Sequence, residues 1–323
     1  MKKKISIVNA CYNEALNIPA MYEAVRDIMA QFPQYDYEHL FADNCSTDNS
    51  AEILEDLCKK DSRVKVILNQ RNFGAERSGL NLRNQASGDC MICLASDFQD
   101  PPEMIPILIK KWEEGNKLVL CQRRKTKANP VMELVRRLYY KIIKSMSDTD
   151  DVIDRCTGFG LYDREVMDWL RWINDADQPT RFLVTELGFK PCIVPFDQQK
   201  RRAGKTSYNF FKYFDAALTS LISTSHKPIR FMTYFGFFCA FASFAVGIVY
   251  LILKLVNWDN FNAGMAPVAV GLFFLGSVQI ICLGMIGEYV GVILNKVTKK
   301  PTVVERKRLN FDTEKNSDYD FSK

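Results

Sequence analysis

Short apolar runs alternate with amphipathic segments along the N-terminal part of the chain. Continuous apolar runs predict buried strands, and apolar residues spaced three and four positions apart predict helices. The predicted strands cover residues 5–10, 37–42, 64–68 and 90–95. The predicted helices cover residues 17–32, 50–60 and 76–85. This alternation predicts an α/β fold with a mostly parallel, Rossmann-like sheet and a ligand crevice at the carboxyl ends of the strands.

Two much longer apolar segments, residues 231–253 and 267–294, lie near the C-terminus. Each exceeds the roughly 20 residues that an α-helix needs to cross a bilayer, so we expect two transmembrane helices. Just before them, residues 207–225 carry apolar side chains at helical spacing. This pattern predicts an amphipathic helix in the membrane interface, although a core helix of the globular domain would have the same spacing.

These patterns divide the 323 residues into four predicted parts. The first is a globular ligand-binding domain, which is followed by an interfacial helix, a two-helix membrane anchor and a tail that is first basic and then polar. Their predicted boundaries are residues 1–206, 207–230, 231–295 and 296–323. Beyond Arg308 the tail is polar, and we expect it to be mobile.

The formal net charge of +5 is modest, but the placement of the charges is informative. Lysines and arginines gather just before the first long apolar segment and just after the second, whereas residues 257–266 between the segments contain neither. The positive-inside rule then places both termini and the globular domain in the cytoplasm, with the intervening loop outside. We expect a multi-pass protein whose partners include the membrane and no nucleic acid.

Polar clusters follow three of the predicted strands. They are Tyr12-Asn13-Glu14, residues 43–48 and residues 97–100. Each cluster alone could be an ordinary cap or turn, but all three fall at strand ends that a parallel sheet brings together. The chain contains no GxGxxG loop and no GxxxxGKS or GxxxxGKT loop. A metal ion or basic side chains would therefore have to hold any phosphate groups bound at this edge.

In their order along the chain, these and later motifs resemble those of inverting family-2 glycosyltransferases. Residues 5–14 and 43–48 are similar to the opening strand and the acidic turn of that family. Four further segments resemble the dolichol-phosphate-mannose-synthase-like branch of the family: residues 71–74, 97–103, 157–159 and 200–206. Residues 287–289 and 300–301 resemble the bacterial polyprenyl-phosphate glucosyltransferases of that branch. Those enzymes carry two C-terminal membrane helices. The resemblance extends over residues 5–305.

The resemblance implies a glycosyltransferase A fold that moves a hexose from a nucleotide-sugar to polyprenyl (undecaprenyl-type) phosphate at the cytoplasmic face of a bacterial inner membrane. The residues that it implies at the nucleotide-sugar are Tyr12, Asn13, Glu14, Asp43, Arg71 and Gly74. Asp97 and Gln99 would hold Mg²⁺ or Mn²⁺ on the diphosphate, because a hard cation with oxygen ligands neutralises the leaving group. The candidate catalytic residues are Asp97, Asp100, Arg123 and Asp154.

A phosphate acceptor simplifies the expected chemistry. Its second pKa is about 6, so at neutral pH it is mostly an anionic nucleophile and needs a general base less than a hydroxyl acceptor would. Catalysis can then depend on positioning and charge stabilisation, which requires cations near the acceptor. The candidates for this role are Arg137, Arg201, Arg202 and Lys205, any of which could equally be a solvated surface residue.

The chain departs from the family pattern at several positions. Ala10 stands where a proline is usual, and Asn44-Cys45 replaces the usual Asp-Gly. Gly160 replaces an arginine. Most importantly, Ala95 stands where the first aspartate of the Asp-x-Asp metal motif is expected, so one metal ligand is missing.

Two other interpretations therefore stay open. One is a glycosyltransferase with another lipid or glycan acceptor, and the other is a non-catalytic nucleotide-sugar-binding membrane scaffold, which the missing aspartate favours. The second long apolar segment contains Gly284, Gly287 and Gly291. Because small residues permit close contact between membrane helices, we also expect a homo-oligomer.

Overall fold

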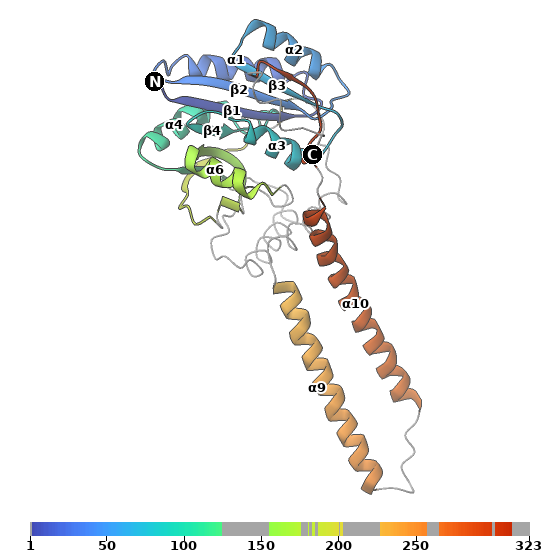
Figure 1. Ribbon diagram of the computed structural model, residues 1–323. Helices are drawn as coiled ribbons and strands as arrows, with labels where there is room; N and C mark the ends of the chain where they lie inside the picture. The colour runs from blue at the N-terminus through green and yellow to red at the C-terminus, as the bar shows by residue number, and fades with distance from the viewer. Residues whose placement is uncertain are drawn as a thin grey trace. The chain divides into compact units, whose positions relative to one another are not determined.

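The computed structural model describes residues 2–124, 155–175, 180, 183–184, 187–199, 201–202, 227–256, 265–298 and 301–311. The chain forms two compact units. One is a globular domain that comprises residues 1–140, 151–213 and 300–323, and the other comprises residues 141–150 and 214–299 and contains two long helices (Figure 1). The globular domain therefore combines chain segments from both sides of the long helices.

The described part of the globular domain is built on an eight-stranded sheet with the strand order β7-β5-β6-β4-β1-β2-β3-β8. The strands are β1 (Lys4–Cys11), β2 (Asp36–Asp43), β3 (Val64–Asn69), β4 (Cys90–Cys93), β5 (Leu118–Arg123), β6 (Cys156–Asp163), β7 (Cys192–Phe196) and β8 (Glu305–Leu309). Strands β4, β1, β2 and β3 are parallel neighbours, as are β5 and β7. Strand β6 runs antiparallel to β4 and β5, and β8 runs antiparallel to β3. The predicted α/β fold with a mostly parallel sheet is confirmed.

Helices cover both faces of the sheet. The helices α1 (Ile18–Met29), α2 (Ser50–Lys60) and α4 (Ile105–Glu113) pack on one face, and α3 (Ala75–Asn84) and α6 (Arg164–Ile173) pack on the other. Strand β1 contributes to both layers, because Ile7 packs with α1 and α4 whereas Val8 packs with α3. Burying a side chain of this size contributes about 1.5–3 kcal/mol. The central position of β1 explains why its sequence is an almost continuous apolar run.

Local sequence signals begin and end several of these helices. Pro19 lies in the first turn of α1, where its missing N–H leaves no intrahelical bond unmade. Asp163 caps α6 by accepting a hydrogen bond from Glu165 N at 3.1 Å. Helix α1 ends at Met29, before the predicted Phe32, because the last turn tightens and Phe32 N donates to Met29 O at 3.0 Å.

The segment after the second long helix returns to the globular domain and forms β8 at the edge of the sheet beside β3. Leu309 packs against the core on the α2 side. Asn310 has φ of 59°, and its Nδ2 donates to Cys58 O at 2.9 Å and to Val64 O at 2.8 Å. The chain is thus bound to the domain as far as Phe311, three residues beyond the point at which we expected a mobile tail.

The second unit contains α9 (Lys227–Val256) and α10 (Met265–Val297), which include the two predicted transmembrane segments. Within them, Ile229–Val249 and Phe274–Leu294 are each 21 residues long and apolar enough to cross a membrane. Large side chains such as Phe237, Phe241 and Leu272 are about 70% or more exposed, as expected for surfaces that face lipid. Two predicted segments lie outside the described residues. They are the interfacial helix at residues 207–225 and residues 257–264 of the loop between the spans.

Candidate active site

The carboxyl ends of β1 and β2 are joined by side-chain hydrogen bonds. Asn13 has a left-handed backbone conformation, with φ of 57°, which asparagine adopts more readily than most residues. Its Oδ1 accepts a hydrogen bond from Thr47 N at 2.8 Å, and its backbone N donates to Ser46 Oγ at 2.9 Å. The Ser46 hydroxyl in turn donates to the fully buried Asp43. Hydrogen bonds therefore join the predicted clusters at residues 12–14 and 43–48.

Asn44 connects the turn after β2 to the loop after β3. Its Oδ1 accepts hydrogen bonds from Asn69 Nδ2 at 3.1 Å and from Phe73 N at 3.0 Å. Its Nδ2 donates to Asn72 Oδ1 at 3.0 Å. An amide can donate and accept at once, whereas an ionised aspartate at this position could only accept. The departure from the family pattern at position 44 thus has a structural role that sequence reasoning missed.

The loop after β3 presents the predicted donor residues Arg71 and Gly74. The Arg71 guanidinium stacks on the Phe73 ring at 4.1 Å from the ring centroid. Gly74 lies at the N-terminus of α3 with φ of 89°, a backbone conformation that favours glycine. A side chain at position 74 would therefore strain the turn that leads into α3.

The turn after β4 is attached to the end of β1. Asn9 Nδ2 donates to Leu94 O at 3.1 Å, and Ser96 Oγ donates to Ala10 O at 3.0 Å. Asp97 is buried at this turn, and its Oδ1 accepts a hydrogen bond from Gln99 N at 3.1 Å. These bonds fix Asp97 at the carboxyl edge of the sheet, where the sequence placed it. Asn9 and Ser96 were not predicted, because neither a buried asparagine in a strand nor a serine in a turn has a local signature that indicates its distant partner.

Strand β4 ends at Cys93 and not at Ala95, because the chain turns to bring Asp100 back onto it. Asp100 Oδ2 accepts a hydrogen bond from Ala95 N at 3.1 Å. Burial raises the pKa of Asp100 to about 6, although the Ala95 N–H and the Arg123 guanidinium oppose that shift. Arg123, at the end of β5, therefore lies close enough to Asp100 to interact electrostatically, which brings two of the predicted catalytic residues together.

The loop after β7 brings Arg201 to the acidic side chains. Arg201 Nε donates to Asp97 Oδ2 at 2.9 Å, and its Nη2 donates to Glu14 Oε1 at 3.3 Å. Arg202 N donates to Asp97 O at 3.3 Å, and its guanidinium lies 5.3 Å from the centroid of the Phe98 ring. Burial raises the pKa of Glu14, while Asn17 and Arg201 act to lower it. Three segments that are distant in sequence thus meet at one charged cluster.

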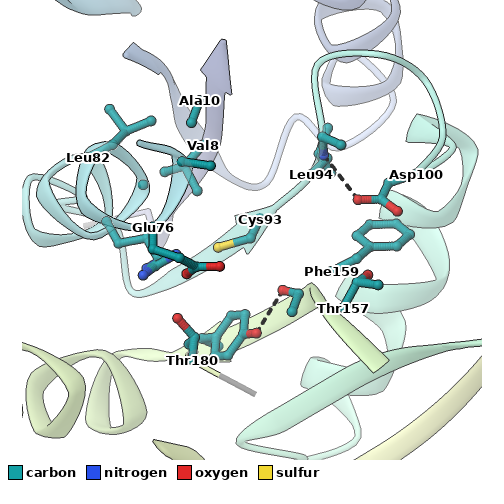
Figure 2. A pocket seen from close by; sticks show the side chains of 16 residues that line it. Val8, Ala10, Glu76, Leu82, Cys93, Leu94, Asp100, Thr157, Phe159 and Thr180 are labelled. Carbon is teal, nitrogen blue, oxygen red and sulfur yellow. Dashed lines mark hydrogen bonds between the residues drawn. The ribbon is translucent and has the colours of Figure 1, made fainter. Parts of the chain in front are cut away.

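A cavity of about 260 Å³ opens beside this cluster, between α3, β1, β4 and β6. Glu76 from α3 and Asp100 from the turn after β4 border it, with Phe159 and Thr157 from β6 (Figure 2). Ala95 also lines the cavity, so the missing motif aspartate leaves space at this point. Within the described residues, Asp100 Oδ1 has no hydrogen-bond partner. Sequence reasoning missed Glu76 and Arg83, which lie two helical turns apart on the α3 face that lines this cavity.

The donor atoms of the acidic cluster decide whether it could hold a metal ion. In the described part of the chain, no group of three or more histidine, cysteine or acidic side chains could enclose a metal ion. Asp97 and Gln99 nevertheless offer a carboxylate and an amide oxygen at the same turn. Mg²⁺ commonly uses one or two carboxylates, several waters and the phosphates of a substrate. The residues therefore fit a cation that arrives with a diphosphate, and they do not form a complete cage for a resident ion.

The remaining predicted residues have different outcomes. Tyr12 is half-buried beside Asn13 at the end of β1. The residues Arg137, Asp154 and Lys205 lie outside the described part of the chain. The fold and the site together define a class of protein: an α/β domain with a charged cluster at the carboxyl edge of its sheet, followed in the chain by two membrane-type helices.

Comparison with known proteins identifies the family within that class. Residues 6–170 match the family model for glycosyl transferase family 2, and residues 227–293 match that for the GtrB C-terminal hairpin. The chain therefore belongs to glycosyltransferase family 2, and its fold is the glycosyltransferase A fold expected from the sequence.

Full-length relatives agree with this assignment. The chain is 32% identical over 312 residues to the uncharacterized glycosyltransferase YkcC of Bacillus subtilis (strain 168), covering 96% of this chain and 95% of the relative. It is 31% identical over 305 residues to the bactoprenol glucosyl transferase of Shigella phage SfII, covering 94% of this chain and 98% of the relative.

Among solved structures, a crystal structure of glucosyl-3-phosphoglycerate synthase from Mycobacterium tuberculosis with Mn²⁺ and UDP-glucose is 17% identical to this chain, with a TM-score of 0.48. The match covers 69% of this chain and 79% of that one.

Proposed function

We propose that this protein transfers a hexose, with inversion, from a nucleotide-sugar to polyprenyl phosphate of the undecaprenyl type. The observation that carries the proposal is the hydrogen bond between Asp97, the candidate metal ligand, and Arg201, a candidate phosphate-binding residue, at the carboxyl edge of the sheet. The hairpin that follows in the chain, and relatives that are named bactoprenol glucosyl transferases, support a lipid acceptor.

The donor side of the proposed reaction uses the joined ends of β1, β2 and β3. Asn13 and the turn containing Asp43 would border the nucleoside, and the loop with Arg71 and Gly74 would close the site from the other side. Asp97 and Gln99 would hold Mg²⁺ or Mn²⁺, which when bound neutralises charge on the diphosphate. Asp100 is a positioning residue in this scheme, because it holds the Ala95 N–H and so shapes the turn.

The acceptor side needs cations more than it needs a base. The phosphate oxygen attacks the anomeric carbon of the hexose, and the bond from that carbon to the nucleoside diphosphate breaks on the opposite side. Because the acceptor is already anionic at neutral pH, Arg201 and Arg202 would act by orienting it and by reducing charge repulsion. Arg137, Lys205 and Asp154 stay predictions for the same site.

We further propose that both termini and the globular domain lie in the cytoplasm of a bacterial cell. Residues 201–202, before the hairpin, and 301–311, after it, belong to the same globular unit. A hairpin that leaves and re-enters one domain supports an even number of membrane crossings. The excess of lysine and arginine on both flanks of the hairpin supports the cytoplasm as that side.

The test is incubation of the purified full-length protein with a panel of nucleotide-sugars and undecaprenyl phosphate, followed by mass measurement of the lipid. We expect one donor to add the mass of a single hexose, and we expect Asp97→Asn to abolish that product while the protein remains folded. Binding of a nucleotide-sugar without any lipid product would favour the scaffold interpretation. Sugar transfer only to a different lipid or to a glycan would favour another acceptor.

A further inference from the structure

Both carboxylate oxygens of Asp97 already have protein donors. Oδ1 accepts from Gln99 N at 3.1 Å, and Oδ2 accepts from Arg201 Nε at 2.9 Å. The same guanidinium reaches Glu14 Oε1 at 3.3 Å. The Arg201 side chain is 28% exposed, whereas those of Asp97 and Glu14 are 9% and 8% exposed. One partly accessible cation therefore compensates two buried carboxylates at the ends of β1 and β4.

This arrangement places the guanidinium where a metal on Asp97 would need access. Two buried carboxylates without a cation between them are unfavourable, because each has lost its hydration and repels the other. A guanidinium on Oδ2 meets that need, but its positive charge also opposes a divalent ion at the same carboxylate. Arg201 and a metal ion would therefore compete for the Asp97 carboxylate.

The main chain of the loop does not depend on this ion pair. Gln199 N donates to Gln99 O at 3.4 Å, and Arg202 N donates to Asp97 O at 3.3 Å. Arg202 also lies over the Phe98 ring. The backbone on both sides of Arg201 is thus bonded to the turn that carries Asp97. The Arg201 side chain can leave Oδ2 by a rotamer change while the loop stays attached, a movement that takes picoseconds to nanoseconds in exposed residues.

We infer that Arg201 is an exchangeable counter-ion: it neutralises Asp97 in the free protein and is released to the acceptor phosphate when a metal-bound nucleoside diphosphate takes its place. The inference rests on the proposed function for the identity of the acceptor. It predicts an order of binding in which the donor and its metal come first and create the phosphate site for the lipid. By linkage, the acceptor must then also tighten binding of the metal-bound diphosphate.

The first measurement is the affinity of the full-length protein in detergent for Mn²⁺ alone. The electron paramagnetic resonance signal of the free ion gives the bound fraction at each Mn²⁺ concentration. We expect Arg201→Ala to bind Mn²⁺ about tenfold more tightly than the unaltered protein, equivalent to about 1.4 kcal/mol. Arg202→Ala is the matched control, because it removes the same charge from the same loop without touching Oδ2. Its affinity should change by less than about twofold, a shift typical of a screened charge.

The second measurement is the affinity for a short prenyl phosphate, with and without Mn²⁺ and a nucleoside diphosphate (UDP or GDP, whichever binds). In the unaltered protein we expect the diphosphate and Mn²⁺ to tighten prenyl phosphate binding several-fold, an ordinary allosteric coupling. In Arg201→Ala this coupling should vanish. Arg201→Lys, which keeps the charge but loses the fork that reaches both carboxylates, should give an intermediate Mn²⁺ affinity and serves if the alanine variant does not fold.

Equal Mn²⁺ affinity in the unaltered protein and in both Arg201 variants would overturn the inference, as would an equal gain in Arg202→Ala. None of these binding measurements requires turnover. If they hold and no lipid-linked hexose forms with any donor, the proposed function fails and the counter-ion role stands. If the lipid product forms and substitutions at position 201 leave the Mn²⁺ affinity unchanged, the proposed function stands and the counter-ion role fails.

Discussion

At the scale of single residues, Asn44 joins two loops on the donor side through its amide. Its amide accepts two hydrogen bonds and donates one, and so ties the loop with Arg71 to the turn after β2. Asn72 Oδ1 also accepts from Gly74 N at 2.9 Å. If position 44 held a residue that could only accept, Asn72 would have to rotate its amide to present its NH₂ group there. That rotation would break the hydrogen bond from Gly74 N to Asn72 Oδ1.

We expect Asn44→Asp to lower the free energy of unfolding by about 1–3 kcal/mol, because it removes a donor and places a second carboxylate beside the buried Asp43. Nucleotide affinity should fall with it, since the loop after β3 loses a contact. Thermal unfolding and a nucleotide titration would measure the two effects. The exposed Asn49→Asp is the matched control and should lose no stability; equal losses in both variants would contradict the role of Asn44.

Glu38 makes the stability of the globular domain depend on pH. Burial alone would raise its pKa, but hydrogen bonds from Ser6, Lys65 and Lys4 lower the pKa to about 2. The folded protein therefore holds this proton less tightly than the unfolded chain does. The stability contributed by Glu38 is fully present above its ordinary pKa of 4.5 and is lost as the pH falls from there through about 2.

We expect Glu38→Gln to be less stable than the unaltered protein by roughly 3 kcal/mol at pH 7, and the two to converge as the pH approaches 2. Denaturant unfolding at a series of pH values would measure the difference. The exposed Glu23→Gln is the control for the substitution itself and should follow the unaltered protein throughout. A difference for Glu38→Gln that did not change between pH 5 and 2.5 would show that lost packing, and not ionisation, is the cause.

At the scale of elements, β8 is the segment whose role was least apparent in the sequence. It covers the edge of β3, and Val304 O accepts a hydrogen bond from Gln70 N at 2.9 Å. Glu305 also accepts a hydrogen bond from Asn81 of α3 at 2.7 Å. The strand therefore supports the loop after β3 from the outside, and an uncovered β3 would offer unpaired backbone groups to other chains.

Ending the chain after Thr302 should therefore weaken nucleotide binding by about threefold to tenfold, the value of one lost backbone hydrogen bond, and should increase aggregation. Ending it after Phe311 keeps the β8 contacts that the described residues make and is the matched control. Nucleotide titration and hydrogen exchange of β3 would distinguish the two truncations. Equal affinity in both would mean that β8 does not position the donor loop.

At the scale of the whole molecule, the return of the chain to the sheet after α10 bears on topology. A reporter fused after Phe311 should score as cytoplasmic, and one inserted between α9 and α10 should score as periplasmic, because positive charges flank the hairpin and are absent between the spans. A periplasmic signal from the fusion after Phe311 would contradict this topology. The expected homo-oligomer, based on Gly284, Gly287 and Gly291, stays a prediction.

Local pattern was sufficient for the elements whose burial is strong and periodic. The first four strands and the three helices between them were predicted to within a few residues, and both predicted spans lie within α9 and α10. No strand after residue 95 was predicted. Strand β8 has the sequence Glu-Arg-Lys-Arg-Leu, which favours a solvated tail, and charged residues of this kind are common on edge strands. Its pairing with β3 gives it backbone partners that no local signal indicates.

The sequence by itself determined the alternation of strand and helix, the two membrane-type helices and the positions of the polar clusters, because periodicity and turn chemistry act between near neighbours. Only the tertiary structure decided the strand order, the return of β8 and the pairing of Arg201 with Asp97, which are 104 residues apart. Such contacts depend on how β1, β4 and the loop after β7 converge on one edge. Their energies belong to pairs of segments and not to either segment alone, so a pattern read along one segment does not contain them.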